Sequence, residues 1–415
     1  MRHRVFAVAL MLAGSLRAAE PPVILWASDP VAPGEMVVAG ALLLSRGAVA
    51  ADAPVIAPAL QPFVDSQRLA GAVVLLADRD RVFTTEAVGF ADRAAARPMR
   101  PDTLFWIASQ TKAVTAAAVM MLVDEGKVAL GDPVAKYIPE FAQLQVGPRD
   151  AKDATPPHAP ARAITVRDVL CHISGMRFLN SKDRSVIDSV SLEQSVRNDL
   201  LEPLLFEPGT RYQYSNEGID TAGLIVQRVS GLPFERFLQE RLFTPLGMRD
   251  TSFFLTTEGV GRLARSYRPN KDKTALEETR ITYLKYPLDG PDRHPSPGGG
   301  LFSTAADVAR FCQMLLRRGE LDGRRYLSEA AVAEMTRKQT GDALKESYGL
   351  GLGVGPTSFG HGGAYATNMQ VDTRRGLITV FLVQHAGWLG DVREMHTALA
   401  KANEQVIARA TAPPR

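Results

Sequence analysis

The run from Ala113 to Leu122 carries no charged side chain, and its hydrophobic positions show little periodicity. Its residues are mostly good helix formers, and a helix that is apolar on every side is a buried helix. The polar segment 124–126 ends the run, and Gly126 suits the left-handed conformation that often follows a helix. The pattern therefore predicts a helix in the interior of the protein.

Strand patterns lie near both ends of the chain, and the middle is helical. We therefore expect an α/β fold of the α+β kind, in which an antiparallel sheet is flanked by helices. The sheet would come from about 60–100 and 300–410, with an all-helical region at about 105–298 inserted between them. The expected strands are 71–77, 81–88, 348–354, 368–372 and 377–383, and the expected flanking helices are 54–68, 304–318, 328–338 and 387–408.

The middle of the chain has recognisable start signals and two irregular segments. Thr165 and Asp168 have the spacing of a capping box, and 219–229 is apolar at helical spacing. Segment 147–163 is rich in Pro, Ala and charge, which predicts a surface insertion. Segment 260–297 combines charges and prolines with weak periodicity, as expected of a long irregular segment over a site.

Composition narrows the class of protein. The chain has 415 residues, 46% hydrophobic and 22% charged, with a formal net charge of +3, which describes a globular protein with a sizeable core. Lys and Arg occur as scattered pairs, so charge gives no case for nucleic acid as a partner. Cys171 and Cys312 lack metal-ligand spacing, and we expect no metal and no cofactor. A bridge between these cysteines and the oligomeric state stay open.

The N-terminus resembles a secretory signal. A basic start at 1–4 is followed by an apolar segment, and a second apolar patch covers 36–44. Small residues near Ala19 and Ala50 offer two cleavage positions, so we expect 1–50 to be signal peptide and leader and 51–410 to be one domain. Neither patch is long enough to span a bilayer, which favours a periplasmic or secreted protein without a transmembrane span. The alternative is a buried amphipathic helix at the N-terminus.

Ser109 and Lys112 would lie in the first turn of the uncharged helix. Their spacing puts both on one face, beside free backbone N–H groups and the positive end of the helix dipole. A buried Lys loses its charge readily and then accepts a proton. The pair therefore predicts an activated hydroxyl, although the same spacing also arises by chance.

Two further stretches carry polar groups that can converge on this pair. Tyr214 and Asn216 can aim a phenol and an amide at one point, and a phenolate beside an ammonium can act as a base. The alternative is that Tyr214 packs and Asn216 caps the next helix. Glycines around His361 suggest a strand edge whose N–H groups form one arm of an oxyanion hole, or else a plain bulged turn. His172 is interpreted as a cap at a helix end.

Other catalytic signatures are missing from the sequence. It has no G-x-S-x-G, no H-E-x-x-H, no Walker loop and no G-x-G-x-x-G. An ordinary α/β-hydrolase, a zincin and a Rossmann or phosphate-loop enzyme are therefore unsupported.

Three motifs in order resemble those of the serine β-lactamase and penicillin-binding-protein superfamily. They are Ser109-Gln-Thr-Lys112, Tyr214-Ser-Asn216 and His361-Gly-Gly363. The Tyr-x-Asn form resembles the class C-like branch, which also holds family VIII carboxylesterases, D-aminopeptidases and D-Ala-D-Ala carboxypeptidases. The resemblance covers about 60–400, and it is supported by segments 169–175, 207–209, 245–248 and 299–304.

The resemblance implies a catalytic group. Ser109 would be the acylated nucleophile and Lys112 its proton partner. Tyr214 would be the base of acylation and the acid to the leaving group. Asn216 would orient Lys112 and the substrate.

The resemblance also implies a substrate-binding strand. The N–H groups of Ser109 and Ala364 would form the oxyanion hole, and His361, Gly362 and Gly363 would contact the substrate. His361 stands where the family pattern has a Lys, and His is mostly neutral at pH 7.

Together with the signal-like N-terminus, the resemblance implies a secreted serine hydrolase that acts through an acyl-enzyme. Its substrates would be small esters, D-amino-acid amides or cell-wall peptides, with poor turnover of β-lactams. The alternatives are a true class C-like β-lactamase and a slowly acylating penicillin-binding or sensor module.

The first prediction concerns export. When the chain is expressed in a bacterium with its own N-terminus, we expect it outside the cytoplasm and shortened near Ala19 or near Ala50, because of its basic start and apolar segment. Cell fractionation with N-terminal sequencing tests this. Full-length protein confined to the cytosol would contradict it.

Overall fold

A computed structural model describes residues 53–148, 156–179 and 186–412. The expected signal peptide and leader, 1–50, lie outside these residues, as does 149–155 of the expected surface insertion. No helix in the described part of the chain is long and apolar enough to cross a membrane.

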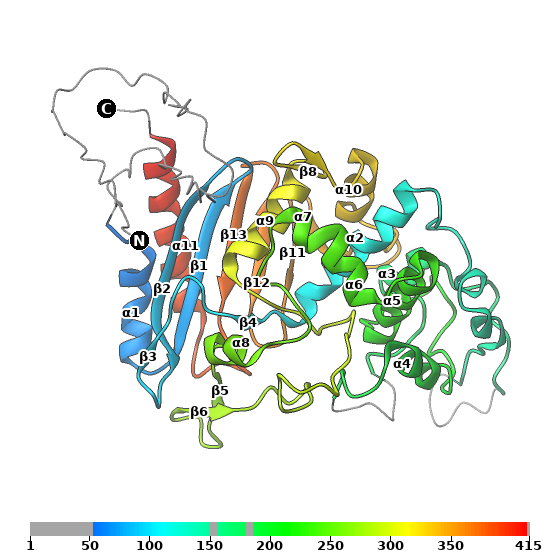
Figure 1. Cartoon of the computed structure of the whole chain (residues 1–415), viewed down its shortest axis with the longest axis horizontal. Helices are drawn as coiled ribbons and strands as arrows, with labels where there is room; N and C mark the ends of the chain where they lie inside the picture. Colours follow the sequence, from blue (N-terminus) through cyan, green and yellow to red (C-terminus); the bar gives the residue numbers. More distant parts are fainter. Residues whose placement is uncertain (1–52, 149–155, 180–185, 413–415) are drawn as a thin grey trace, which may run out of the picture. The chain divides into compact units, whose positions relative to one another are not determined.

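Segments from both ends of the described chain pair in one seven-stranded antiparallel sheet (Figure 1). β1 joins the two halves, because it pairs with β2 on one side and with β13 on the other, where Val73 lies opposite Leu382. The predicted antiparallel sheet is therefore confirmed. In spatial order the strands are β10 (Gly353–Gly355), β11 (Ser358–Gly362), β12 (Asn368–Asp372), β13 (Leu377–Leu382), β1 (Gly71–Asp78), β2 (Val82–Asp92) and β3 (Arg97–Pro98).

Helices cover both faces of this sheet, which is why β1 is a continuous apolar run. Successive residues of a strand point to opposite faces. Ala72 and Val74 join the core beneath α1 and α11, whereas Val73 and Leu75 join the larger core shared with α9. Figure 1 shows α1 and α11 together on one side of β1 and α9 on the other. Their bounds are α1 (Ile56–Asp65), α9 (Ala305–Leu316) and α11 (Arg393–Thr411).

The uncharged run forms α2 (Thr111–Asp124), which is buried on all sides from Thr111 to Leu122. Gly126 follows it with φ 69°, the left-handed conformation expected there. α2 packs against α5 (Asn216–Ser230) and α10 (Glu329–Thr336). Other helical elements of the described chain are α3 (Val166–Leu170), which begins with the predicted capping box, α4 (Leu192–Asp199), α6 (Phe234–Leu238), a π-helical turn (Gln239–Phe243), α7 (Thr244–Leu246) and α8 (Thr257–Arg262).

In the described part of the chain three short ladders lie outside the main sheet. One of them, a hairpin within 260–297, shows that the region at about 105–298 is not all-helical as expected, because this segment lacks helical periodicity. In 260–297, β5 and β6 form a hairpin, after which the chain continues to β7 without helix or strand. The paired strands are β4 (Phe105–Trp106) with β7 (Phe302–Ser303), β5 (Ser266–Pro269) with β6 (Leu276–Thr279), and β8 (Glu320–Leu321) with β9 (Arg324–Arg325).

The strand expected over 348–354 is largely wrong, because only its end enters the sheet as β10. Gly351 has φ 68°, and its N–H donates to the carbonyl of Leu170. A Cβ at Gly351 would lie 2.4 Å from the carbonyl oxygen of Lys112. The segment therefore crosses the start of α2, a contact between distant parts of the chain that periodicity does not contain.

The second prediction concerns packing behind α2. Gly223 lies in the middle of α5, where alanine ordinarily favours the helix. A Cβ at Gly223 would lie 2.2 Å from Cγ of Pro297, so Gly223→Ala must displace the loop beyond it. We expect the substitution to lower the free energy of unfolding by about 1–3 kcal/mol, the usual cost of overpacking, as measured by urea denaturation.

Gly131→Ala is the matched control, because a Cβ at Gly131 meets no atom within 4 Å. Its effect should stay within about 0.5 kcal/mol. Equal stability of the two variants would show that the Pro297 segment shifts freely.

Candidate active site

Ser109 lies in a strained turn between β4 and α2. The turn Ala108–Gln110 is a 3-10 helix, so Ser109 comes just before α2, whereas Lys112 lies in its first turn as expected. Ala108 has φ 48°, a left-handed conformation that costs a residue with a side chain about 1–3 kcal/mol. Ser109 is half-buried although both its neighbours are buried. The turn therefore leaves Ser109 partly exposed.

Lys112 is completely buried and its ammonium group has three acceptors. Nζ donates to Oδ1 of Asn216 and to the carbonyl of Gly298, both at 2.6 Å. It also lies 3.3 Å from Oγ of Ser109. The acceptors come from three separate segments, so the tertiary structure completes the group that the sequence predicted.

Ser215 and Asn216, at the start of α5, have different hydrogen-bonding roles. Oγ of Ser215 accepts from the N–H of Gly218 at 2.9 Å and caps the helix. The alternative in which Asn216 serves as the cap is therefore wrong. The amide of Asn216 is left to bind Lys112.

Burial sets the protonation equilibrium of Lys112. Desolvation lowers the pKa of Lys112 to about 7, although the carboxylate of Asp220 acts to raise it. Charged and neutral forms are therefore both populated near neutral pH. The neutral form can take the proton of Ser109 across the 3.3 Å contact.

Tyr214 lies beside both groups but is not a phenolate. Burial raises the pKa of Tyr214 to about 12, and its hydrogen bond with Ser109 lowers it by less. A phenolate beside the Lys112 ammonium can act as a base, as the sequence suggests, but the raised pKa of Tyr214 does not favour a phenolate in the free protein. Nζ of Lys112 lies over the ring face, 4.7 Å from the centroid. Near neutral pH the phenol is therefore a proton donor, and Lys112 is the stronger candidate base.

The structure confirms that His172 caps a helix end, because it follows α3 in the left-handed conformation and the next N–H, of Ile173, donates to the carbonyl of Asp168. His172 also packs against Tyr214, a contact that the sequence does not predict. It is fully buried with φ 66°, and its ring centroid lies 4.5 Å from that of Tyr214 and 4.6 Å from that of Tyr348. Nδ1 accepts from the N–H of Ser215 at 3.2 Å. His172 thus fixes the loop that carries the phenol. Its place within the resembling segment 169–175 was the one available signal.

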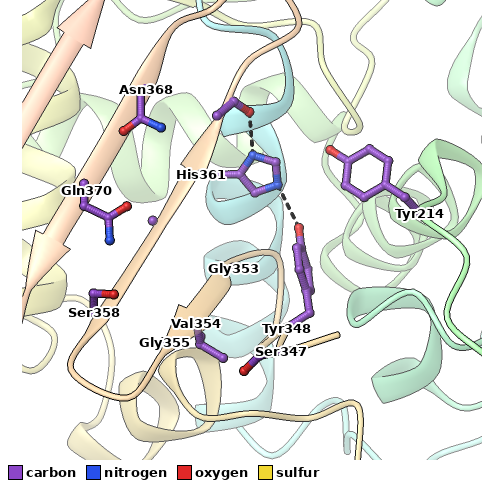
Figure 2. Close-up of a pocket in the computed structure, with 12 residues that line it drawn as sticks. Tyr214, Ser347, Tyr348, Gly353, Val354, Gly355, Ser358, His361, Asn368 and Gln370 are labelled. Atoms are coloured by element: carbon purple, nitrogen blue, oxygen red, sulfur yellow. Dashed lines mark hydrogen bonds between the residues drawn. The ribbon is translucent and has the colours of Figure 1, made fainter. Parts of the chain in front are cut away.

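His361 is held as a neutral ring. Nδ1 lies 2.6 Å from the carbonyl of Gly362, which only accepts, so Nδ1 carries the proton and Nε2 accepts from Tyr348 at 2.8 Å (Figure 2). Burial, and then the charge of Lys112, lower the pKa of His361 to about 4. The expectation that this position holds no permanent cation is confirmed.

Gly363 brings the end of β11 against the turn that carries Ser109. A Cβ there would lie 2.6 Å from the carbonyl oxygen of Ile107 and 3.3 Å from Cβ of Ala108, so only glycine allows the approach. Ala364 comes next and is exposed in a turn. The oxyanion role of the Ser109 and Ala364 N–H groups stays a prediction.

An open cavity of about 450 Å³ begins beside Tyr214 and His361 and extends over β10, β11 and β12 (Figure 2). Its lining includes the bare backbone of Gly360 and Gly362 and the amide of Asn368. None of the lining residues is Lys, Arg, Asp or Glu. The cavity therefore offers hydrogen bonds but no fixed charge to a ligand.

The two cysteines are buried and free, so the bridge left open by the sequence does not form. Burial raises the pKa of each thiol, Cys171 and Cys312, to about 12, which makes both poor nucleophiles. No group of three or more His, Cys, Asp or Glu in the described ranges could hold a metal ion.

Comparison with known proteins connects this geometry to one family. A family model described as Beta-lactamase matches residues 56–404. Protein Rv1367c of Mycobacterium tuberculosis is 33% identical over 384 residues, covering 85% of this chain and 94% of that protein. Esterase EstB of Burkholderia gladioli is 29% identical over 361 residues, covering 77% of this chain and 87% of the esterase.

A solved structure supports the fold. EstCE1, a hydrolase with promiscuous acyltransferase activity, has a TM-score of 0.68 with this chain at 24% identity. The match covers 85% of this chain and 97% of EstCE1. The expected fold, an antiparallel sheet with an inserted helical region, is thereby confirmed.

The third prediction separates the roles of Lys112 and Tyr214. We expect kcat/KM for hydrolysis to rise with pH through about 7, because neutral Lys112 accumulates there. Tyr214→Phe should retain this rise and lower kcat by about a hundredfold, since it removes only a proton donor. Lys112→Met should abolish turnover.

Tyr212→Phe is the control for loss of a neighbouring phenol hydroxyl, because Tyr212 is half-buried and packs against His172. It should change kcat by less than about threefold. Loss of the rising limb in Tyr214→Phe would assign the base to the phenol instead.

Proposed function

Because the chain belongs to the β-lactamase family, we propose that it is a serine hydrolase that works through an acyl-enzyme and prefers small neutral esters. The observation that carries the proposal is the contact of half-buried Ser109 with fully buried Lys112, whose ammonium lies over Tyr214, a residue that lines a cavity without charged side chains. The similarity to an esterase adds support. Export, expected from the N-terminal sequence, is part of the proposal.

In the proposed reaction Oγ of Ser109 attacks the ester carbonyl while neutral Lys112 takes its proton. The N–H groups of Ser109 and Ala364 stabilise the charge that develops on the carbonyl oxygen. The C–O bond of the tetrahedral intermediate breaks, and the leaving alkoxide receives a proton from the phenol of Tyr214 or the ammonium of Lys112. Water then hydrolyses the acyl-enzyme with the same groups acting in reverse.

The absence of charged residues from the cavity lining supports neutral esters over the other expected substrates. β-Lactams and cell-wall peptides ending in a carboxylate gain from a nearby cation, but the lining contains no Lys or Arg and His361 is neutral. D-Amino-acid amides carry an ammonium, and no carboxylate lines the cavity to receive it. A neutral ester needs neither partner.

The fourth prediction tests this preference. Purified protein should cleave p-nitrophenyl butyrate with a higher kcat/KM than nitrocefin, and Ser109→Ala should lose at least about a thousandfold on both. His361→Lys should raise the nitrocefin-to-ester ratio about tenfold, or ~1.4 kcal/mol, because it adds a cation beside the cavity.

His361→Asn is the matched control, since it alters the ring without adding charge, and its ratio should stay near that of the wild type. A fluorophosphonate probe should label Ser109. Faster hydrolysis of nitrocefin than of the ester by the wild type would overturn the proposed preference, whereas labelling of another serine would overturn the mechanism.

A further inference from the structure

Several hydrogen bonds hold the loop Pro297–Leu301 against α2 and β4. The carbonyl of Gly298, in this loop, accepts a hydrogen bond from Lys112. Oγ1 of Thr115, one turn along α2 from Lys112, donates to the carbonyl of Pro297 at 2.8 Å. Nε1 of Trp106 donates to the carbonyl of Gly299 at 2.7 Å. The position of the Gly298 carbonyl is therefore set by contacts on both sides of it.

Asp220, on α5, also binds this loop. Its Oδ1 accepts from the N–H of Gly298 at 2.8 Å, and the carbonyl of Gly298 accepts from Nζ of Lys112 at 2.6 Å. Asp220 is only 6% exposed and lies one turn after Asn216 on α5, so one helix acts on Lys112 directly through Asn216 and indirectly through Gly298.

We propose that Asp220 is a positioning residue of this hydrolase, which holds the Gly298 carbonyl against Lys112 and adjusts by its buried charge how readily Lys112 binds a proton. The inference rests on the proposed function, in which Lys112 is the base. It adds a role for a residue that lies outside the three sequence motifs.

The electrostatics of the site agree with this role. Burial lowers the pKa of Lys112 to about 7, and the charge of Asp220 is what acts to raise it. The other ionisable groups around Lys112 are neutral near pH 7: burial raises the pKa of Tyr214 to about 12, and it lowers the pKa values of His172 and His361. Loss of the Asp220 charge should therefore lower the pKa of Lys112 further.

The titration of Glu217 must be distinguished from that of Lys112. It lies on α5 near Asp220, and burial, with the charges of Asp220 and Glu202, raises its pKa to about 7, whereas Arg177 acts to lower it. Glu217 thus titrates in the same range as Lys112. Its carboxylate accepts from the backbone N–H of Arg177, which is not among the contacts of Lys112.

The fifth prediction compares pH profiles. Ester kcat/KM is measured from about pH 5 to about pH 9 in the wild type and in Asp220→Asn, whose amide oxygen still accepts from Gly298. We expect the rising limb to move about one pH unit lower in Asp220→Asn, because the ammonium of Lys112 loses a favourable negative neighbour. At acid pH the variant should therefore retain a larger fraction of its own maximal rate than the wild type does.

Three further variants isolate the charge. Asp220→Ala should show the same shift and a maximal rate lower by a further factor of about ten, since the Gly298 N–H loses its acceptor. Thr115→Val removes a neutral contact to the same loop, so its limb should not move. Glu217→Gln removes the overlapping titration and should also leave the limb in place.

A limb in Asp220→Asn that coincides with the wild type would overturn the inference and leave Asp220 a purely structural anchor. Should Asp220→Asn fail to fold by circular dichroism, Asp220→Ala supplies the same comparison. A wild type with no rising limb would instead contradict the proposed base. In that case NMR titration of 13C-labelled Lys112, identified by its loss in Lys112→Met, still tests the inference through the pKa in wild type and Asp220→Asn.

Discussion

The buried ammonium group of Lys112 is the constraint on which the site and much of the surrounding packing depend. A charged amine inside a protein is costly unless each of its protons has an acceptor. The acceptors here belong to Ser109, Asn216 and Gly298, which are far apart in sequence. α2, α5 and the loop after β6 must therefore meet at one point, and glycines occur where these elements approach most closely, as Gly223 does against Pro297.

The same burial determines which group changes charge near neutral pH. Desolvation brings the pKa of Lys112 to about 7, while it keeps Tyr214 protonated and His361 neutral. Among these three side chains Lys112 alone can exchange a proton readily in this range, which favours it as the first acceptor of the Ser109 proton. The cavity is uncharged because its lining holds the neutral His361, amides and glycines, and this supports the proposed preference for substrates without charge.

The sheet supplies the rigid frame for this arrangement. Pairing of β1 with β13 joins the two ends of the described chain, and it fixes β11 beside the nucleophile turn through β12. Gly363 completes the contact because a Cβ would collide with Ile107. The ring of His172 packs against Tyr214, and the hydroxyl of Tyr348 donates to His361, so these two residues support the side chains at the site. The groups of the candidate active site thus come from loops and helix starts that regular elements position.

The sequence by itself determined the features that depend on local pattern. The uncharged run specified α2, and strand patterns near both ends of the chain specified β1, β2, β12 and β13. Thr165 and Asp168 specified a capping box, and three short motifs located Ser109, Lys112, Tyr214, Asn216 and His361. Only the tertiary structure decided that 348–352 leaves the sheet, that His172 supports the phenol, that Asp220 reaches Lys112 through Gly298, and that Tyr214 stays protonated. The reason is physical: periodicity and motifs report neighbours within a turn or a strand, whereas close approach, desolvation and the pKa of a buried group depend on atoms brought together from distant parts of the chain.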